Sequence, residues 1–465
     1  MRRLWLIIAA FLAVQVAIVC GAANGPFVDE ALYAVAGMRV LEGQGLSDGY
    51  LAWFNGSPFV WPVIAAIGHR MGGLTGARLM AVLLSTVTLL AVAKTAETLF
   101  GPTAAAWATA ALAVNGLFMA LAHFAVYDVP ALTGIAVSMW CLTRFSRSDH
   151  WIWLMAAAIA FAFAVISKYA YAPMLVPLAG LLVSGHRSRH LGRALAVFLA
   201  LAGLLVAAYF LVFFGTPVPT STDAYLQQSF RRTRGHIAVL QTIYGLAPFV
   251  LALAGAIVAW RKQHRLLAVT CLVALSLSPA FHVWAENFVS SQKHVVPSFL
   301  FAYLLAGVAL ERLWRSRSRA TAFLLVTLLA VWGGVQWYWQ EHSWSDTRPL
   351  ATYLAQNMKR GERVLADSSW NYILPLYPRG LITSPSEVID ASYSPDLDGL
   401  DVCRIAWLVG ADTVDRIRKA VEQCGHRRVL SVATRHYYFD TTQLRGGTYA
   451  VVVGLYRLPE SLGSR

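Results

Sequence analysis

The chain has 465 residues, 57% of them hydrophobic and only 13% charged, with a formal net charge of +14. Soluble domains carry about 25% charged residues, so this composition excludes a soluble globular protein and indicates that most of the chain lies in lipid. The positive charge does not indicate a nucleic-acid-binding protein, because the basic residues separate apolar runs and do not form one basic segment. This pattern is typical of a membrane protein oriented by its lysines and arginines.

Eleven apolar runs predict membrane spans. In chain order they are Leu4–Cys20, Leu79–Leu99, Ala104–Ala122, Val129–Leu142, Trp151–Ile166, Ala172–Val183, Leu191–Phe214, Ile237–Trp260, Leu266–Trp284, Val296–Leu310 and Ala320–Trp339. The first run follows Arg2 and Arg3 as a signal peptide would, but it is closer in length to a span than to a signal core of about 7 to 15 residues. We therefore expect an uncleaved first helix.

One orientation explains the basic residues between these runs. With the amino terminus in the cytoplasm, the inward loops hold Lys94, Arg144, Arg147, Arg187, Arg189, Arg193, Arg261, Lys262, Arg265, Arg312, Arg315, Arg317 and Arg319. The run Val60–Met71 is also apolar, but a span there would invert every later loop. We expect it, with a helix near Glu30–Leu41, to be interfacial within a long first external loop, residues 22–78.

The composition changes at Glu341, so we divide the chain into a membrane domain, residues 1–340, and an external domain, residues 341–465. In the second part an amphipathic stretch, Thr413–Gln423, alternates with β-like runs at Arg363–Ala366, Ile405–Val409 and Ala450–Val453, which predicts a small α/β domain.

Two of the five cysteines, Cys403 and Cys424, lie in this predicted external domain. They form a disulfide in an oxidising compartment, or both are buried thiols, and the sequence leaves the two alternatives open. No cysteine or histidine spacing resembles a structural zinc site.

The first external loop opens with two adjacent acids, Asp29 and Glu30, just past the first span. Carboxylates there are placed for general-base catalysis on an acceptor near the lipid headgroups. The alternative is that one of them caps the helix that follows, since acids favour a helix amino terminus.

A second external acid, Asp128, stands beside Tyr127 in the turn before a returning span, and Lys168 and the pair Lys293-His294 occupy later outward turns. Acids and cations on one membrane face suit a phosphate-bearing donor, because cations hold the phosphate while an acid takes the acceptor proton. The alternatives are that Asp128 caps its helix and that the lysines extend to the interface from helix ends. We expect Asp29 and Asp128 to converge on one external cavity.

A basic cluster breaks the orientation rule in the loop of residues 215–236. It contains Arg231, Arg232, Arg234 and His236. The cluster binds a lipid phosphate or an anionic acceptor, or it is a solvated loop, and both alternatives stay open.

These motifs carry a family resemblance across the membrane part of the chain. They are Asp29-Glu30-Ala31-Leu32-Tyr33, Asn55-Gly56-Ser57-Pro58, Ala77-Arg78-Leu79, Tyr127-Asp128-Val129-Pro130, Ile166-Ser167-Lys168 and Lys293-His294-Val295-Val296-Pro297. By their order, spacing and sidedness the chain resembles the GT-C superfamily of lipid-carrier-dependent glycosyltransferases, in particular the protein O-mannosyltransferases and the bacterial lipid A aminoarabinose transferases. The segment Phe54–Pro62 departs from relatives that carry a lysine before the proline pair.

The resemblance implies a polytopic α-helical membrane protein of about eleven spans with a carboxyl-terminal external α/β domain, in a bacterial inner membrane. It implies that Asp29 is the catalytic base, with Glu30 beside it, and that Asp128 is the second-loop acid. It gives Lys168, Lys293, His294, Arg231, Arg234 and Tyr127 as contacts for phosphate or substrate. The implied reaction is an inverting transfer of a sugar from a polyprenyl-phosphate donor to an envelope lipid, glycan or protein acceptor.

Two other functions remain as alternatives. A lipid-linked glycan ligase or polymerase would share the external site, and a transporter or flippase would share the many spans, but transporters usually show repeated halves and charges near the midplane. We expect membrane lipids as partners and no nucleic acid. The sequence identifies no cofactor and does not decide whether a divalent metal ion takes part.

The charge pattern makes a testable prediction about topology. Alkaline phosphatase fused after Arg465 should be active, because eleven spans place that end outside, whereas a fusion after Arg189 should be inactive. An inactive fusion after Arg465, in a stably inserted protein, would contradict the odd number of spans.

Overall fold

A computed structural model describes residues 2–458 apart from 23–24, 46–56, 58, 186–189, 215–233, 287–290, 317, 343–345, 368, 392–400, 412–414 and 441–444. Its internal contacts form two compact units. The first comprises Met1–Cys20 and Gly45–Gln340, and the second comprises Gly21–Gln44 and Glu341–Arg465.

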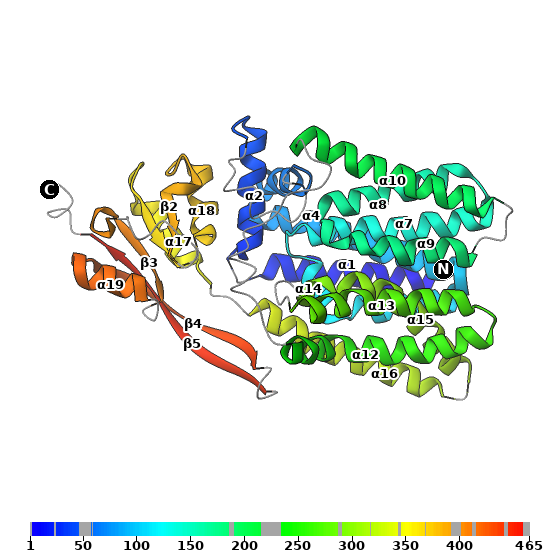
Figure 1. Ribbon diagram of the computed structural model, residues 1–465. Helices are drawn as coiled ribbons and strands as arrows, with labels where there is room; N and C mark the ends of the chain where they lie inside the picture. The colour runs from blue at the N-terminus through cyan, green and yellow to red at the C-terminus, as the bar shows by residue number, and fades with distance from the viewer. Residues whose placement is uncertain are drawn as a thin grey trace. The chain divides into compact units, whose positions relative to one another are not determined.

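The first unit is helical, and its long helices run alongside one another (Figure 1). Its helices are α1 (Arg2–Gly21), α4 (Trp61–Phe100), α5 (Pro102–Ala113), α6 (Gly116–Leu121), α7 (Asp128–Ser148), α8 (Trp151–Ser167), η1 (Tyr169–Met174), α9 (Leu175–Gly185), α10 (Leu191–Phe214), α12 (Arg234–Arg261), α13 (Arg265–Ala285), α14 (Ser291–His294), α15 (Val296–Arg315) and α16 (Arg319–Glu341). Helices suit lipid because they satisfy their backbone hydrogen bonds internally.

Seven helices of the described chain are long and apolar enough to cross a membrane, namely α1, α4, α10, α12, α13, α15 and α16. The chain is therefore a multi-pass membrane protein, as its composition predicts. The other four predicted spans fall on α5 with α6, on α7, on α8 and on α9, of which α8 and α9 are apolar but shorter. The count of eleven and the orientation remain predictions.

Helix α4 consists of two segments that meet at a pair of glycines. Gly73 has φ of 61°, in the left-handed region that favours glycine, and Gly72 also leaves the helical conformation. A Cβ added to Gly76 would lie 2.1 Å from the Gly68 carbonyl oxygen, so only glycine permits this close approach. The run Val60–Met71 is thus helical up to the break, and its interfacial placement stays a prediction.

Helix α15 is the most enclosed of the seven, with 89% of its apolar stretch buried. Glycines let its neighbours approach closely, as is common between membrane helices. A Cβ on Gly255 of α12 would lie 1.9 Å from the Leu305 carbonyl oxygen, and one on Gly307 of α15 would lie 2.5 Å from the Ala104 carbonyl oxygen. This packing fixes the middle of α15 against α12 and α5.

The second unit contains a five-stranded sheet of order β2-β1-β3-β5-β4. Its elements are α2 (Val28–Leu41), α17 (Arg348–Asn357), β1 (Val364–Ala366), α18 (Trp370–Leu376), η2 (Tyr377–Arg379), η3 (Pro385–Glu387), β2 (Val388–Asp390), η5 (Val402–Arg404), β3 (Trp407–Ala411), α19 (Asp415–Cys424), β4 (Arg427–Asp440) and β5 (Arg445–Arg457). Strand β1 pairs parallel with β2 and β3, whereas β5 pairs antiparallel with β3 and β4 in a long hairpin (Figure 1). Leu365, Leu408 and Ile417 lie in its core. The predicted small α/β domain is confirmed.

Helix α2 confirms the helix predicted near Glu30–Leu41 and packs against α18 within this second unit. The Tyr377 hydroxyl donates a hydrogen bond to Glu42 Oε2 at 2.9 Å, just past the end of α2. Burial, followed by the hydrogen bond and negative charge of Glu42, raises the pKa of Tyr377 to about 12. The phenol therefore stays protonated and able to donate at neutral pH.

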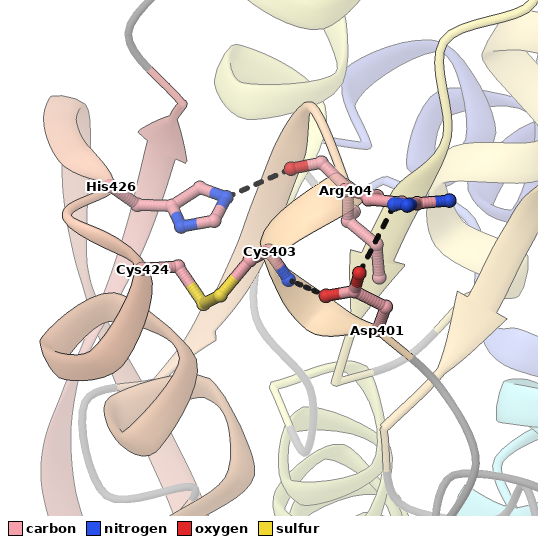
Figure 2. The surroundings of a disulfide bond; sticks show 6 residues. Asp401, Cys403, Arg404, Cys424 and His426 are labelled. Carbon is pink, nitrogen blue, oxygen red and sulfur yellow. Dashed lines mark hydrogen bonds and ion pairs between the residues drawn. A yellow bond between two sulfur atoms is a disulfide. The ribbon is translucent and has the colours of Figure 1, made fainter. Parts of the chain in front are cut away.

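A disulfide joins Cys403 of η5 to Cys424 of α19, with Cα atoms 5.1 Å apart (Figure 2). The sequence did not decide whether these cysteines form a disulfide, and the structure rejects the alternative of two free thiols. Polar contacts surround the bond. Asp401 accepts from the Cys403 amide at 3.2 Å and pairs with Arg404 at 3.1 Å, and His426 Nε2 lies 2.8 Å from the Ile405 carbonyl oxygen.

Removing the disulfide should destabilise the second unit. A cross-link over 21 residues restricts the unfolded chain, so Cys403→Ser should lower the free energy of unfolding of this unit by about 3 kcal/mol. Denaturant titration with limited proteolysis of residues 341–465 measures the change. Cys20→Ser, which removes an exposed thiol of α1, is the control and should leave the titration unchanged.

Candidate functional site

A buried polar network lies where α7 begins and α8 ends. Asp128 is the first residue of α7, and Lys168 follows the last residue of α8 in an extended conformation. Lys168 Nζ donates to Asp128 Oδ1 at 2.5 Å, and the side chains of both residues are 1% exposed. The Tyr171 hydroxyl, on η1, donates to the same oxygen at 2.8 Å. Three elements thus meet at one carboxylate.

The ammonium group of Lys168 also lies against two aromatic rings. Nζ is 4.8 Å from the centroid of the Tyr127 ring and 5.5 Å from that of Tyr171. Aromatic faces attract cations, most strongly where water is excluded. These contacts stabilise the charged form of Lys168 and hold its position.

A histidine pair adjoins this network. His282 Nε2, on α13, lies 2.8 Å from His294 Nδ1, and the His294 ring lies edge to face against Tyr171 with 6.1 Å between centroids. The Ser278 hydroxyl donates to the His294 carbonyl oxygen at 2.6 Å. The carbonyl oxygen of Lys293 lies 3.4 Å from the Tyr171 hydroxyl. The turn before α15 is therefore fixed beside Asp128.

Among the residues that the structure describes, two buried atoms of this cluster have no hydrogen-bond partner, namely Asp128 Oδ2 and His294 Nε2. Most buried polar groups are paired, so an unpaired carboxylate oxygen in a charged site requires an explanation. Asp128 Oδ2 can accept a hydrogen bond from a hydroxyl, and His294 Nε2 can exchange one with a polar ligand. The cluster therefore has the groups to bind a polar, hydroxyl-bearing molecule.

The structure brings together Tyr127, Asp128, Lys168, Lys293 and His294, which the sequence placed in separate outward turns. The sequence reasoning missed two members. Tyr171 had a usable signal, because it follows Lys168 by three residues. His282 had no usable signal, because it lies inside a predicted span, twelve residues before its partner His294.

Asp29 and Glu30 lie in the first turn of α2, in the second unit. Glu30 is buried, and its Oε2 accepts a hydrogen bond from the Phe27 amide at 2.9 Å, so the capping alternative is confirmed for Glu30. Asp29 is half-buried. The expected convergence of Asp29 with Asp128 stays a prediction.

The basic loop is described only in part. Arg231 and Arg232 lie outside the described residues. Arg234 begins α12 and pairs with Glu286 at 3.1 Å, and the side chains are 64% and 44% exposed. An exposed ion pair of this kind contributes little to stability.

Within the described residues, no group of three or more histidines, cysteines, aspartates and glutamates is arranged to hold a metal ion.

Residues 57–213 match the family model of dolichyl-phosphate-mannose-protein mannosyltransferases. No curated protein matches the chain. Among solved structures, ArnT from Cupriavidus metallidurans bound to undecaprenyl phosphate is similar over 98% of both chains, with a TM-score of 0.67 and 17% identity. The chain has the GT-C fold. The resemblance and the fold class expected from the sequence are thereby confirmed.

Two further GT-C structures match. The arabinofuranosyltransferase AftD from Mycobacteria has a TM-score of 0.57 at 15% identity, covering 97% of this chain and 40% of AftD. The oligosaccharyltransferase AglB from Archaeoglobus fulgidus, in complex with an inhibitory peptide and a dolichol-phosphate, has a TM-score of 0.53 at 11% identity, covering 98% and 74%. The matched family segment contains Asp128, Lys168 and Tyr171.

The buried ion pair makes a prediction about stability. Lys168→Met should lower the free energy of unfolding by about 3–5 kcal/mol, because it leaves the Asp128 carboxylate buried without its countercharge. Adding Asp128→Asn should recover part of the loss. Denaturant titration in detergent measures both.

The matched control is Lys94→Met, which removes a partly exposed pair with Glu97 and should cost less than about 1 kcal/mol. Equal losses for Lys94→Met and Lys168→Met would show that the Asp128 pair has no special role.

Proposed function

We propose that the chain is an inverting glycosyltransferase that moves a sugar from a polyprenyl-phosphate donor to an envelope lipid, glycan or protein acceptor at the external membrane face. The observation that carries the proposal is the buried Asp128–Lys168–Tyr171 network, in which Asp128 Oδ2 has no partner in the described part of the chain. Lys293 and His294 lie beside this network. It combines a hydroxyl-binding carboxylate with cations suited to a phosphate.

Three matches support the choice of donor. The ArnT structure is bound to undecaprenyl phosphate, and the AglB complex contains a dolichol-phosphate. The matching family model is named for dolichyl-phosphate-mannose. A polyprenyl phosphate is the chemistry common to all three.

The proposed reaction is a single displacement. The acceptor hydroxyl oxygen attacks the anomeric carbon from the face opposite the phosphate, and the bond from that carbon to the phosphate oxygen breaks. The bonding pair leaves on the phosphate, and the acceptor proton moves to Asp29. The configuration at the anomeric carbon inverts.

The proposed roles follow from charge. Lys168 is already neutralised by Asp128, so its main part is to hold that carboxylate in position. Lys293, which is half-buried, brings the second positive charge to this cluster and would stabilise the leaving phosphate. Asp128 Oδ2 would orient a sugar hydroxyl, and His294 Nε2 would contact a phosphate oxygen.

The positions of these groups favour a transferase over a transporter or flippase. Transporters bind substrates near the bilayer midplane on interrupted helices. Asp128 lies at the first residue of α7, Lys168 just after α8, and His294 just before α15, so all three stand at helix ends. A site at helix ends suits an acceptor that arrives from the aqueous phase.

The base assignment is tested with Asp29→Asn, which keeps the size of the side chain but removes the base. Transfer should slow by roughly a hundredfold to ten-thousandfold, since general-base catalysis contributes about that much. Mass spectrometry of envelope lipids and glycans with and without the gene identifies the product, whose formation by the purified variant is then timed.

Glu30→Gln is the matched control. The amide oxygen of glutamine can still accept the hydrogen bond from the Phe27 amide, so this variant should fold and transfer sugar near the parental rate. An Asp29→Asn protein that elutes normally and transfers at the parental rate would reject Asp29 as the base.

A further inference from the structure

A groove of about 700 Å³ lies in the first unit, lined by the starts of α1, α5 and α16 and the ends of α4 and α15. Arg2 and Arg3 line it together with apolar and aromatic side chains. None of the groups of the Asp128 cluster lines it. The groove therefore needs an explanation of its own.

Positive charge exceeds negative charge in this groove. Its acid, Glu97, is paired with Lys94 at 2.8 Å, so the pair is neutral. Arg2 and Arg3 are both exposed, and neither guanidinium group forms an ion pair or hydrogen bond within the described part of the chain. Two guanidinium groups are thus available to an anion, and guanidinium binds phosphate with two parallel hydrogen bonds.

Beside this charge lies an aromatic surface suited to hydrocarbon. Trp107, Trp314 and Phe323 contact one another with ring centroids 5.3–5.6 Å apart, and all three line the groove. Phe323 is 56% exposed. Tryptophan at a helix end is typical of the membrane interface, where the ring meets both headgroup and acyl chain.

The groove is remote from the Asp128 cluster. Helix α15 starts two residues after His294 and ends at Arg315, next to Trp314, and its 20 residues span about 30 Å. The two sites thus lie at opposite ends of one buried helix. The same end as the groove carries the basic loops that the sequence predicts to be cytoplasmic, and Arg147 there donates to the Thr98 carbonyl oxygen at 2.8 Å.

We propose that this groove binds one anionic phospholipid of the inner leaflet, with its phosphate between Arg2 and Arg3 and an acyl chain against Trp107, Trp314 and Phe323. Charge complementarity and the adjoining aromatic surface favour an anionic lipid over a zwitterionic one. The lipid fills a gap between α1, α5 and α16 and holds the first helix in place. The proposal is independent of the transferase activity.

Native mass spectrometry of the full chain tests it, with phosphatidylglycerol and phosphatidylcholine of identical acyl chains as competing probes. The protein should retain one phosphatidylglycerol in preference to phosphatidylcholine. Arg2→Gln with Arg3→Gln should weaken retention roughly twenty-five-fold, because each of the two basic residues near an anionic headgroup contributes about fivefold.

Two further variants separate the groove from general surface charge and from altered insertion. Arg261→Gln with Lys262→Gln removes two exposed charges at the end of α12, outside the groove, and should retain the lipid as the parent does. Ala106→Phe fills the groove while keeping every charge, and hence the topology, and should reduce retention of the acyl chain.

The proposal would be overturned if Ala106→Phe retained phosphatidylglycerol at the parental level. It would also be overturned if the Arg2/Arg3 and the Arg261/Lys262 double variants lost phosphatidylglycerol equally. Equal retention of the two lipids by the parental protein would overturn it as well.

Discussion

The buried pair of Asp128 and Lys168 is the interaction on which one end of the helical unit depends. A carboxylate and an ammonium that have both lost water are costly unless they meet with good geometry and further hydrogen bonds. At this site the Tyr171 hydroxyl and two aromatic rings supply that support. Because the partners come from α7, α8 and η1, the pair fixes three elements to one point.

This constraint also explains the organisation of the neighbouring cations. Lys168 and Tyr171 both bond to Asp128 Oδ1, and the second carboxylate oxygen, Oδ2, is buried without a partner among the described residues. Lys293 and His294 are fixed beside it through the turn before α15. The Asp128–Lys168 pair is thus neutral overall and held rigidly. Lys293 adds a second positive charge beside it, and His294 adds an imidazole. Such preorganisation suits a reaction in which negative charge builds up on a leaving phosphate.

Helix α15 connects the two ends of the helical unit. Its burial is nearly complete, and glycines at its contacts with α12 and α5 leave no room for adjustment. A change at the cluster end that shifts α15 would be transmitted along a stiff element to Trp314 and the groove at the other end.

The sequence by itself indicated the membrane class, the helical segments and the small α/β domain, because hydropathy and charge are local properties of a chain. It also singled out Asp128, Lys168, Lys293 and His294 as candidate site residues. It did not decide whether Glu30 caps a helix or takes part in base catalysis. It also did not decide whether Cys403 and Cys424 form a disulfide. The structure shows the cap, through the hydrogen bond from the Phe27 amide to Glu30, whereas the base role stays a prediction. Only the tertiary structure decided the disulfide, because the 5.1 Å separation of the cysteine Cα atoms depends on how distant segments fold together. His282, Trp107 and Trp314 carried no functional pattern along the chain. Their partners lie in other helices, and only packing brings them together.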